Sequence, residues 1–264
     1  MEIAGSTILV TGASSGIGAE LAPQLAARGA TVGIVARRRD RLEQVLERCR
    51  EHAPGSRAWV VDLSDLDAAE QVVRDAWQAF GHLDCLVNNA AMGKRKHVTD
   101  LTAAELDEVM RLDFASPVRM AMTALPRMLE RGSGLIVNVG SPAGRFGIVH
   151  ESAYCAAKFA LSGWSEAAAM DLADTGVRVK LVLPGAIATE IWERRPGELP
   201  GLVEGPFTPA DECAAGIIEA IESPAFEHYV PDLKDVVVHK TGDVEGFIEV
   251  MAAMARAARE ARRI

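Results

Sequence analysis

Apolar residues along this chain fall into two kinds of segment that alternate. Six short runs, rich in Val, Ile and Leu, have the length and composition of buried strands; they are Thr7–Thr11, Thr31–Ala36, Ala58–Asp62, Asp84–Asn88, Leu135–Gly140 and Val177–Pro184. Longer stretches with apolar residues at helical spacing lie between them; they include Ile17–Arg28, Arg41–His52, Leu66–Phe80 and Tyr154–Asp174. Strands that are apolar on both faces and separated by helices are joined by crossovers, so the pattern predicts an α/β fold with a parallel sheet.

The remainder of the chain continues this alternation. A further helix, a short strand and a last helix are expected at Ala210–Glu222, His228–Pro231 and about Val244–Arg262. Because no linker, repeat or low-complexity tract interrupts the chain, residues 1–264 are expected to form a single domain, with a C-terminal helical extension at about 243–264. A Pro- and Gly-rich stretch follows residue 190, and a long loop in a compact domain is usually a lid or a binding loop. We therefore expect a substrate lid at about 190–209.

Composition excludes several classes of protein. The 264 residues carry a net charge of −9, which disfavours a non-specific nucleic-acid binder. The cysteines form no CxxC and the histidines no HExxH, so we expect neither a metal site nor a disulfide framework. The scattered cysteines are Cys49, Cys85, Cys155 and Cys213. They fit a reducing cytoplasm. Since the sequence also shows no signal peptide and no apolar run of the roughly 18 residues that cross a membrane, we expect a cytoplasmic protein that does not enter a membrane.

The stretch TILVTGASSGIGAEL combines a strand, a glycine-rich turn and the start of a helix. In its GxxxGxG spacing, Gly12 permits the tight turn, Gly16 lets the backbone approach a phosphate, and Gly18 lets the helix and strand pack closely. The helix N-terminus then offers free N–H groups to a pyrophosphate. An ordinary turn needs only one glycine, so the pattern predicts a dinucleotide site in a single Rossmann-type, doubly wound parallel sheet with helices on both faces. Other residues expected to line the site are Ser14, Ser15 and Ile17.

The end of the second predicted strand indicates which dinucleotide binds. An NAD(H) site usually has an Asp or Glu here for the ribose hydroxyls, but this chain has Arg37 and Arg38 instead. A guanidinium matches a 2′-phosphate in charge and in fork geometry, so NADP(H) is favoured over NAD(H). The alternative is that these arginines merely start the next helix in solvent, which is what we expect of Arg39.

Six short motifs follow one another along the chain. They are TGASSGIG (Thr11–Gly18), DL (Asp62–Leu63), NNAA (Asn88–Ala91), NVGS (Asn138–Ser141), YCAAK (Tyr154–Lys158) and LPGAIAT (Leu183–Thr189). In this order and spacing they resemble the motifs of the short-chain dehydrogenase/reductase family, over roughly residues 5–190. The tail beyond about residue 225 differs from the common family ending. The resemblance implies a nicotinamide-dependent oxidoreductase that interconverts a carbonyl and an alcohol.

The resemblance also implies roles for individual residues around the cofactor. Asp62 would accept a hydrogen bond from the adenine amino group, and Leu63 would pack near the adenine. Asn89 and Ala90 would line the adenosine ribose. Residues expected around the nicotinamide are Pro184, Gly185, Ile187 and Thr189. For Asp62 a purely structural role as a helix cap stays open.

Tyr154 and Lys158 stand four residues apart and so share one face of a predicted helix. The pKa of a tyrosine in water is about 10, and a nearby ammonium lowers it by favouring the phenolate. The phenol can then exchange a proton with a carbonyl or alcohol oxygen, which Ser141, at a strand end, would hold in place. The resemblance also assigns Lys158 to the nicotinamide ribose hydroxyls. Tyr and Lys at this spacing are common on surface helices, but the glycine turn and Ser141 favour catalysis here.

Asp113 departs from the pattern that the resemblance implies. Many family members have an Asn in this helix, where it binds a water that leads to the lysine. A carboxylate here either serves the same relay or changes it, and near Lys158 it would raise the pKa of the lysine and weaken its effect on Tyr154. We expect Asp113 to be a site residue. The alternative is a helix N-cap, a position that Asp often takes.

Apolar residues near the motifs are candidate walls of a substrate pocket. They are Met92, Pro142, Ala143, Phe146, Ile148, Trp192 and Phe207. Such walls suit a hydrophobic ketone or secondary alcohol, with His150 and Glu190 as possible polar contacts. Arg194 and Arg195 could meet an acidic substrate group, although a solvated loop is the simpler explanation.

The predicted function is hydride transfer between NADP(H) and a carbonyl or secondary alcohol substrate, which we expect to be an apolar small molecule. Two alternatives remain: the same chemistry with NAD(H), and a nucleotide-sensing protein that binds the cofactor without turnover. In relatives, the helices that correspond to residues 115–131 and 159–173 pair subunits, so the resemblance implies a homodimer or homotetramer.

Overall fold

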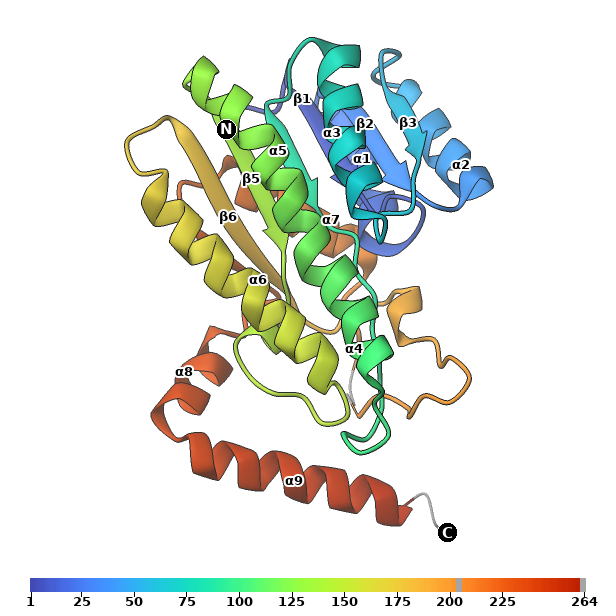
Figure 1. Cartoon of the computed structure of the whole chain (residues 1–264), viewed down its shortest axis with the longest axis vertical. Helices are drawn as coiled ribbons and strands as arrows, with labels where there is room; N and C mark the ends of the chain where they lie inside the picture. The colour runs from blue at the N-terminus through green and yellow to red at the C-terminus, as the bar shows by residue number, and fades with distance from the viewer. Residues whose placement is uncertain (203–205, 262–264) are drawn as a thin grey trace.

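The computed structural model describes residues 1–202 and 206–261, with side chains up to residue 257. Seven parallel strands form one sheet in the order β3-β2-β1-β4-β5-β6-β7 (Figure 1). The strands are β1 (Thr7–Thr11), β2 (Thr31–Ala36), β3 (Arg57–Val60), β4 (Cys85–Asn88), β5 (Gly134–Val139), β6 (Val177–Pro184) and β7 (Glu227–Val230). The predicted doubly wound parallel sheet is confirmed. Residues 203–205 of the expected lid and residues 262–264 of the expected C-terminal extension lie outside the described residues.

Helices cover both faces of the sheet. They are α1 (Gly16–Ala27), α2 (Arg39–Arg50), α3 (Leu66–Phe80), α4 (Ala103–Met110), α5 (Ser116–Arg131), α6 (Ser152–Asp171), α7 (Ala210–Glu222), α8 (Lys234–Gly242) and α9 (Val244–Ala261). A π-helical turn, η1 (Arg111–Ala115), joins α4 to α5, and two 3-10 turns are η2 (Pro142–Gly144) and η3 (Glu190–Trp192). Figure 1 shows α3, α5 and α6 in front of the sheet and α7 behind it.

Alternation along the strands divides the core between the two faces. On β1, Ile8 and Val10 pack with α1, α2 and α7, whereas Leu9 packs with α3 and α5 on the other face. This is the period-two geometry of a strand that is buried on both sides. It explains why the buried strands appear in the sequence as nearly continuous apolar runs.

The order of the strands places the ligand crevice. The chain winds outward from β1 to β3 on one side and then returns to β4 and winds outward to β7 on the other. In such sheets the crevice outside the carboxyl ends of the strands, at the point where the order reverses, binds ligands. Here that point lies between β1 and β4, directly after Thr11 and Asn88.

One helix was not predicted from the sequence. The nine residues of α8 carry three consecutive valines, and Val236 and Val238 are 39% and 62% exposed. Because α8 lacks an apolar stripe, its sequence has no helical periodicity to detect. The helix contacts α6, where Lys240 Nζ lies 5.7 Å from the ring centroid of Phe159.

Candidate active site

The glycine turn forms a tight backbone cradle after β1. Gly12 has a φ of +68°, and a Cβ on it would lie 2.8 Å from the Cα of Ala90. A Cβ on Gly18 would lie 2.6 Å from the carbonyl oxygen of Gly12, and one on Gly16 would lie 2.8 Å from Thr189 Cγ2. A side chain at Gly12 or Gly18 would therefore clash with backbone, and one at Gly16, whose φ is +53°, would press on the Thr189 side chain.

Thr11 ties the ends of β1 and β4 together at this cradle. Its hydroxyl accepts hydrogen bonds from the backbone N–H groups of Asn89 (2.9 Å) and Ala90 (3.0 Å). The amide of Asn89 donates back to the Thr11 carbonyl at 2.9 Å. These bonds fix Asn89 and Ala90 in the crevice, where the resemblance expected them.

Arg38, rather than Arg37, reaches the cradle. Its Nε donates to the Ser14 hydroxyl at 3.2 Å and its Nη2 to the Ser15 hydroxyl at 2.5 Å. Arg37 lines the same groove, but its Nη1 lies 3.5 Å from an Asp62 carboxylate oxygen rather than at the serine hydroxyls. Arg39 forms an exposed ion pair with Glu43 along α2, as expected of a solvated helix residue.

Asp62 does not cap α3. The N-cap is Asp65, whose carboxylate accepts from the backbone N–H groups of Asp67 and Ala68. Asp62 instead accepts from the backbone and the hydroxyl of Ser64 at 2.9 and 2.7 Å. The helix-cap alternative is therefore wrong, and the other carboxylate oxygen, Oδ2, lies 3.5 Å from Arg37 Nη1.

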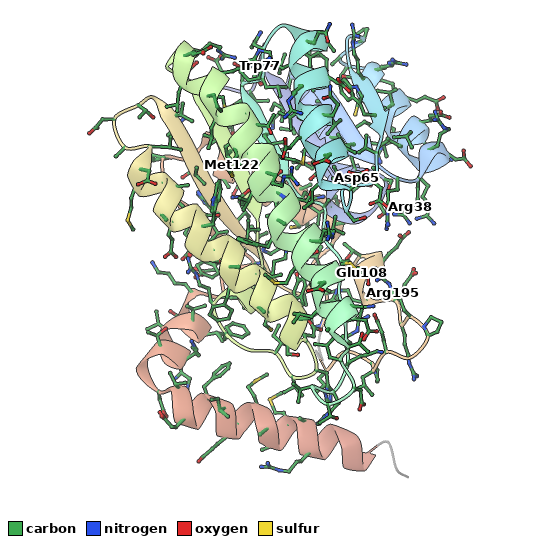
Figure 2. All side chains as sticks on the ribbon, in the orientation of Figure 1. Arg38, Asp65, Trp77, Glu108, Met122 and Arg195 are labelled. Atoms are coloured by element: carbon green, nitrogen blue, oxygen red, sulfur yellow. The ribbon has the colours of Figure 1, made fainter. Side chains whose placement is uncertain are left out.

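A groove of about 510 Å³ joins these residues. Its walls include Gly12, Ser14, Ser15, Gly16 and Ile17 of the glycine turn, together with Arg37, Arg38, Asp62, Leu63, Asn89, Ala90 and Thr189. The segment from Glu190 to Pro196 covers it. Figure 2 shows Arg38 and Arg195 on the same side of the molecule, at this groove.

Ser141, Tyr154 and Lys158 meet beside the groove. Ser141 follows β5, and its hydroxyl accepts from the backbone N–H of Ala143 at 3.2 Å. Tyr154 and Lys158 lie on α6, with Lys158 Nζ 5.5 Å from the centroid of the Tyr154 ring. All three residues line one cavity and are nearly buried. The structure thus brings together the three residues predicted to be catalytic.

Asp113 is a buried partner of Lys158. Its Oδ1 accepts from the Met92 backbone N–H at 2.9 Å, and its Oδ2 lies 3.6 Å from Lys158 Nζ. That second distance makes an ion pair rather than a hydrogen bond. The lysine donates to the Val139 carbonyl at 3.2 Å. The helix-cap alternative for Asp113 is wrong, because the residue lies inside the η1 turn and Thr102 caps α4.

The pKa of Tyr154 moves opposite to the expected direction. Burial raises it first and the Asp113 carboxylate adds to the rise, whereas a hydrogen bond with Ser141 lowers it. Burial likewise raises the pKa of Asp113 to about 6 and lowers the pKa of Lys158, although each holds the other toward its charged form. Because burial is the largest cause of the rise, the phenol pKa is not lowered as expected from the Lys158 ammonium.

The substrate cavity, of about 430 Å³, is mostly apolar. Four expected walls line it: Pro142, Phe146, Ile148 and Trp192. Pro184, Gly185 and Ile187, which the resemblance placed at the nicotinamide, line it too.

Other expected wall residues serve as packing instead. Met92 packs with Val109, and Ala143 packs with Tyr154. The centroid of the Phe207 ring lies 5.1 Å from that of Trp192, with the two rings tilted by 48°. The expected polar contact Glu190 lies in the cofactor groove, and the His150 ring lies 6.0 Å from that of His97.

Two charged residues of this cavity were missed from the sequence. Arg95 is 3% exposed and donates to the carbonyls of Ile191 (2.9 Å) and Glu193 (3.1 Å), which anchors the lid. It also lies 3.6 Å from the buried carboxylate of Glu198. Glu151 stands one helical turn before Tyr154, and burial raises its pKa to about 7 against the opposing effect of Arg95. The spacing of Glu151 from Tyr154 was the only available signal.

The C-terminal segment also closes the substrate cavity. Leu233 and Met251 are among its walls, and the Phe247 ring on α9 lies 5.5 Å from that of Phe146. Figure 1 shows α9 at the end of the molecule below α6 and α8. The sequence predicted this helix but not its place at the cavity.

The described residues hold no cluster of three or more His, Cys, Asp or Glu side chains that could bind a metal ion. Among those same residues, no helix has the length and apolarity that crossing a membrane requires.

Comparison with known proteins identifies the family. A model described as short chain dehydrogenase matches residues 6–198. The chain is 34% identical over 190 residues to an uncharacterized oxidoreductase of Thermotoga maritima, a match that covers 72% of this chain and 75% of that protein. It is 33% identical over 188 residues to the ketoacyl reductase HetN of Nostoc sp., across 70% of this chain and 65% of HetN, under two thirds of its length. The chain belongs to the short-chain dehydrogenase/reductase family.

A solved structure supports the same assignment. The short-chain dehydrogenase from Sphingobium yanoikuyae in complex with NADPH has a TM-score of 0.79 at 29% identity, over 92% of this chain and 95% of that one. As a family member, this short-chain dehydrogenase is an oxidoreductase of alcohols and carbonyls that uses a nicotinamide cofactor.

Proposed function

We propose that this short-chain dehydrogenase transfers a hydride between NADP(H) and an apolar ketone or secondary alcohol. One observation carries the proposal: the groove behind the glycine turn adjoins the cavity of Ser141 and Tyr154. They share the walls Ile17, Ala91, Thr189 and Ile191. A dinucleotide in the groove and a carbonyl compound in the cavity would therefore meet beside the phenol.

The residues present fit NADP(H). A Cβ at Gly12 or Gly18 would collide with backbone, so the cradle presents bare N–H groups to a pyrophosphate. Arg38, with the hydroxyls of Ser14 and Ser15 at its edge, presents a donor set suited to a 2′-phosphate. The NADPH complex of the Sphingobium yanoikuyae relative supports this assignment.

In the proposed reduction, the chain's own residues supply the proton. The cofactor, when bound, supplies the hydride. Ser141 holds the substrate oxygen, and Tyr154 donates its phenolic proton to that oxygen as negative charge develops there. Since burial and Asp113 keep the phenol protonated, Tyr154 is suited to act as the acid. Lys158, held by Asp113 and Val139, stabilises the phenolate that remains and binds the ribose.

The apolar walls favour a hydrophobic substrate. The cavity has walls that include Ile17, Val139, Pro142, Phe146, Ile148, Trp192 and Leu233, which suit an apolar ligand. Glu151 and Arg95 are its charged side chains apart from Lys158, among the residues described.

The experiment is a panel of apolar ketones and alcohols followed at 340 nm with NADPH, NADH and their oxidised forms. The proposal predicts turnover, with NADPH preferred. Arg38→Ala should weaken NADPH binding about tenfold or more and leave NADH binding nearly unchanged. Turnover with a preference for NADH would contradict the proposed cofactor and favour the alternative of the same chemistry with NAD(H). Cofactor binding without turnover on any substrate would favour the nucleotide-sensing alternative, which the Asp113–Lys158 ion pair keeps in consideration.

Three further expectations belong to this proposal. We propose that residues 1–264 act as one domain, with the lid and the C-terminal segment closing the substrate cavity. Exposed apolar residues on α5 and α6, among them Met122 (labelled in Figure 2) and Met170, at 59% and 73% exposed, support pairing of subunits through these helices. The four cysteines are free thiols, which fits a reducing cytoplasm.

A further inference from the structure

The lid is fastened to α2 through one carboxylate. Glu190 is the first residue of η3 and comes directly after Thr189 of the cofactor groove. Its Oε2 accepts from Arg38 Nη1 at 2.6 Å, and its Oε1 accepts from Arg41 Nη1. Two guanidinium groups from the end of β2 and the start of α2 thus hold the beginning of the lid.

Arg38 is also the residue that faces the cradle. Its Nε and Nη2 are taken by the hydroxyls of Ser14 and Ser15, and its Nη1 is taken by Glu190. A phosphate that binds a guanidinium in the forked, two-bond manner needs two of these same donors. The Glu190 carboxylate therefore accepts a hydrogen bond from an Arg38 N–H group that a 2′-phosphate could use.

We propose that Glu190 is a specificity residue that competes with the 2′-phosphate of NADP(H) for Arg38. The inference rests on the proposed function, since it takes Arg38 as the site of that phosphate. Binding of the phosphate and the ion pair that holds the lid then oppose each other. NAD(H) carries a hydroxyl in place of the 2′-phosphate, so its binding does not compete with Glu190 for the Arg38 guanidinium.

Arg41 strengthens the competition. Its guanidinium holds the second carboxylate oxygen, so Glu190 stays near Arg38 even after Arg38 has turned to a phosphate. A carboxylate beside a phosphate dianion repels it. Glu190 consequently weakens NADP(H) binding in both arrangements, and its removal should strengthen that binding.

The test measures dissociation constants for NADPH and NADH by fluorescence titration, with no turnover required. Glu190→Gln removes the charge and keeps the size of the side chain. The matched control is Glu193→Gln, because Glu193 lines the same groove on the same lid but forms no ion pair among the described residues. We expect Glu190→Gln to lower the dissociation constant of NADPH about two- to fivefold and to change that of NADH less than about twofold. The control should change both constants by the same small factor.

The outcomes separate this inference from the proposed function. Wild-type protein that binds NADH at least as tightly as NADPH contradicts the proposed cofactor preference. An NADH-to-NADPH ratio that is the same in Glu190→Gln and wild type overturns the competition, whichever cofactor wild type prefers. A selective loss of NADH binding in Glu190→Gln also overturns it, because the carboxylate would then bind the ribose hydroxyls. Circular dichroism checks that both variants are folded.

Discussion

Two carboxyl groups set the electrostatics around Tyr154. Burial raises the pKa of the phenol most, and Asp113 and Glu151 each add to the rise, because a nearby negative charge disfavours the phenolate. A phenol that stays protonated can give its proton to a carbonyl over a wide pH range. Alcohol oxidation needs the phenolate and should rise toward alkaline pH.

Asp113→Asn should keep turnover within about threefold and shift the pH profile of alcohol oxidation to lower pH. The physical reason is that the variant removes a negative charge that raises the phenol pKa. The measurement is the initial rate of oxidation between pH 6 and pH 10, with cofactor affinity as the control. A collapse to the background rate in folded protein would show that the carboxylate itself is required.

Glu151→Gln should stabilise the protein in a pH-dependent way. Burial raises the pKa of Glu151 from 4.5 to about 7, so the wild-type side chain is tolerated while protonated and becomes unfavourable once ionised. In wild type, the free energy of unfolding is not reduced by Glu151 below pH 4.5. It falls as pH rises from 4.5 to about 7, because the unfolded state ionises this carboxyl first. The variant should therefore gain up to roughly 3 kcal/mol over that interval and no more above it. Chemical denaturation at pH 5, 7 and 8.5 measures the difference, and a gain that is constant with pH would contradict it.

Residue-level geometry was partly predictable. The i to i+4 spacing placed Tyr154 and Lys158 correctly, because helix geometry fixes that relation. The sequence could not show whether Arg37 or Arg38 reaches the cradle. Adjacent residues in extended backbone point to opposite sides, and only the turn decides which one faces the cradle. Contact between Asp113 and Lys158 depends on the η1 turn, and the sequence showed no sign of that extra residue in the helix.

At the scale of elements, the lid depends on one buried arginine. Arg95 sits between Lys94 and Lys96, which both form ion pairs with Glu105 on α4. A basic run of this kind appears solvated in the sequence, yet its middle residue turns inward and binds two carbonyls of the lid.

Arg95→Leu should loosen the lid. The change removes two hydrogen bonds and leaves the buried carboxylate of Glu198 without its partner, a loss of roughly 3 to 5 kcal/mol in similar buried pairs. We expect faster trypsin cleavage after Arg194 and a higher KM for ketones, with kcat less affected. The double variant Arg95→Leu with Glu198→Gln should recover part of the loss. Equal cleavage rates in all three proteins would show that Arg95 does not hold the lid.

Elements were predictable where one pattern dominated. β1, β2, β6, α3 and α7 have the expected bounds, because long apolar runs or strong helical periodicity define them. α8 was missed because it buries no apolar stripe.

At the scale of the whole molecule, the cofactor groove comes mostly from the first half of the chain, with Thr189 and the start of the lid added, and the substrate cavity is closed by the second half. The winding of the sheet was predictable and placed the crevice at the β1–β4 boundary. The contributions of Leu233 and Met251 were not, because they depend on how the C-terminal segment folds back on the cavity. Substrate size should therefore be controlled by residues far from the family motifs.

Tyr154→Phe is the most direct test of the central claim that this phenol transfers the proton. The variant keeps the ring and removes the hydroxyl, so the fold and NADPH affinity should be preserved. The account predicts a fall in kcat/KM of about 10²- to 10⁴-fold for both ketone reduction and alcohol oxidation. Undiminished rates in folded, NADPH-binding protein would contradict it.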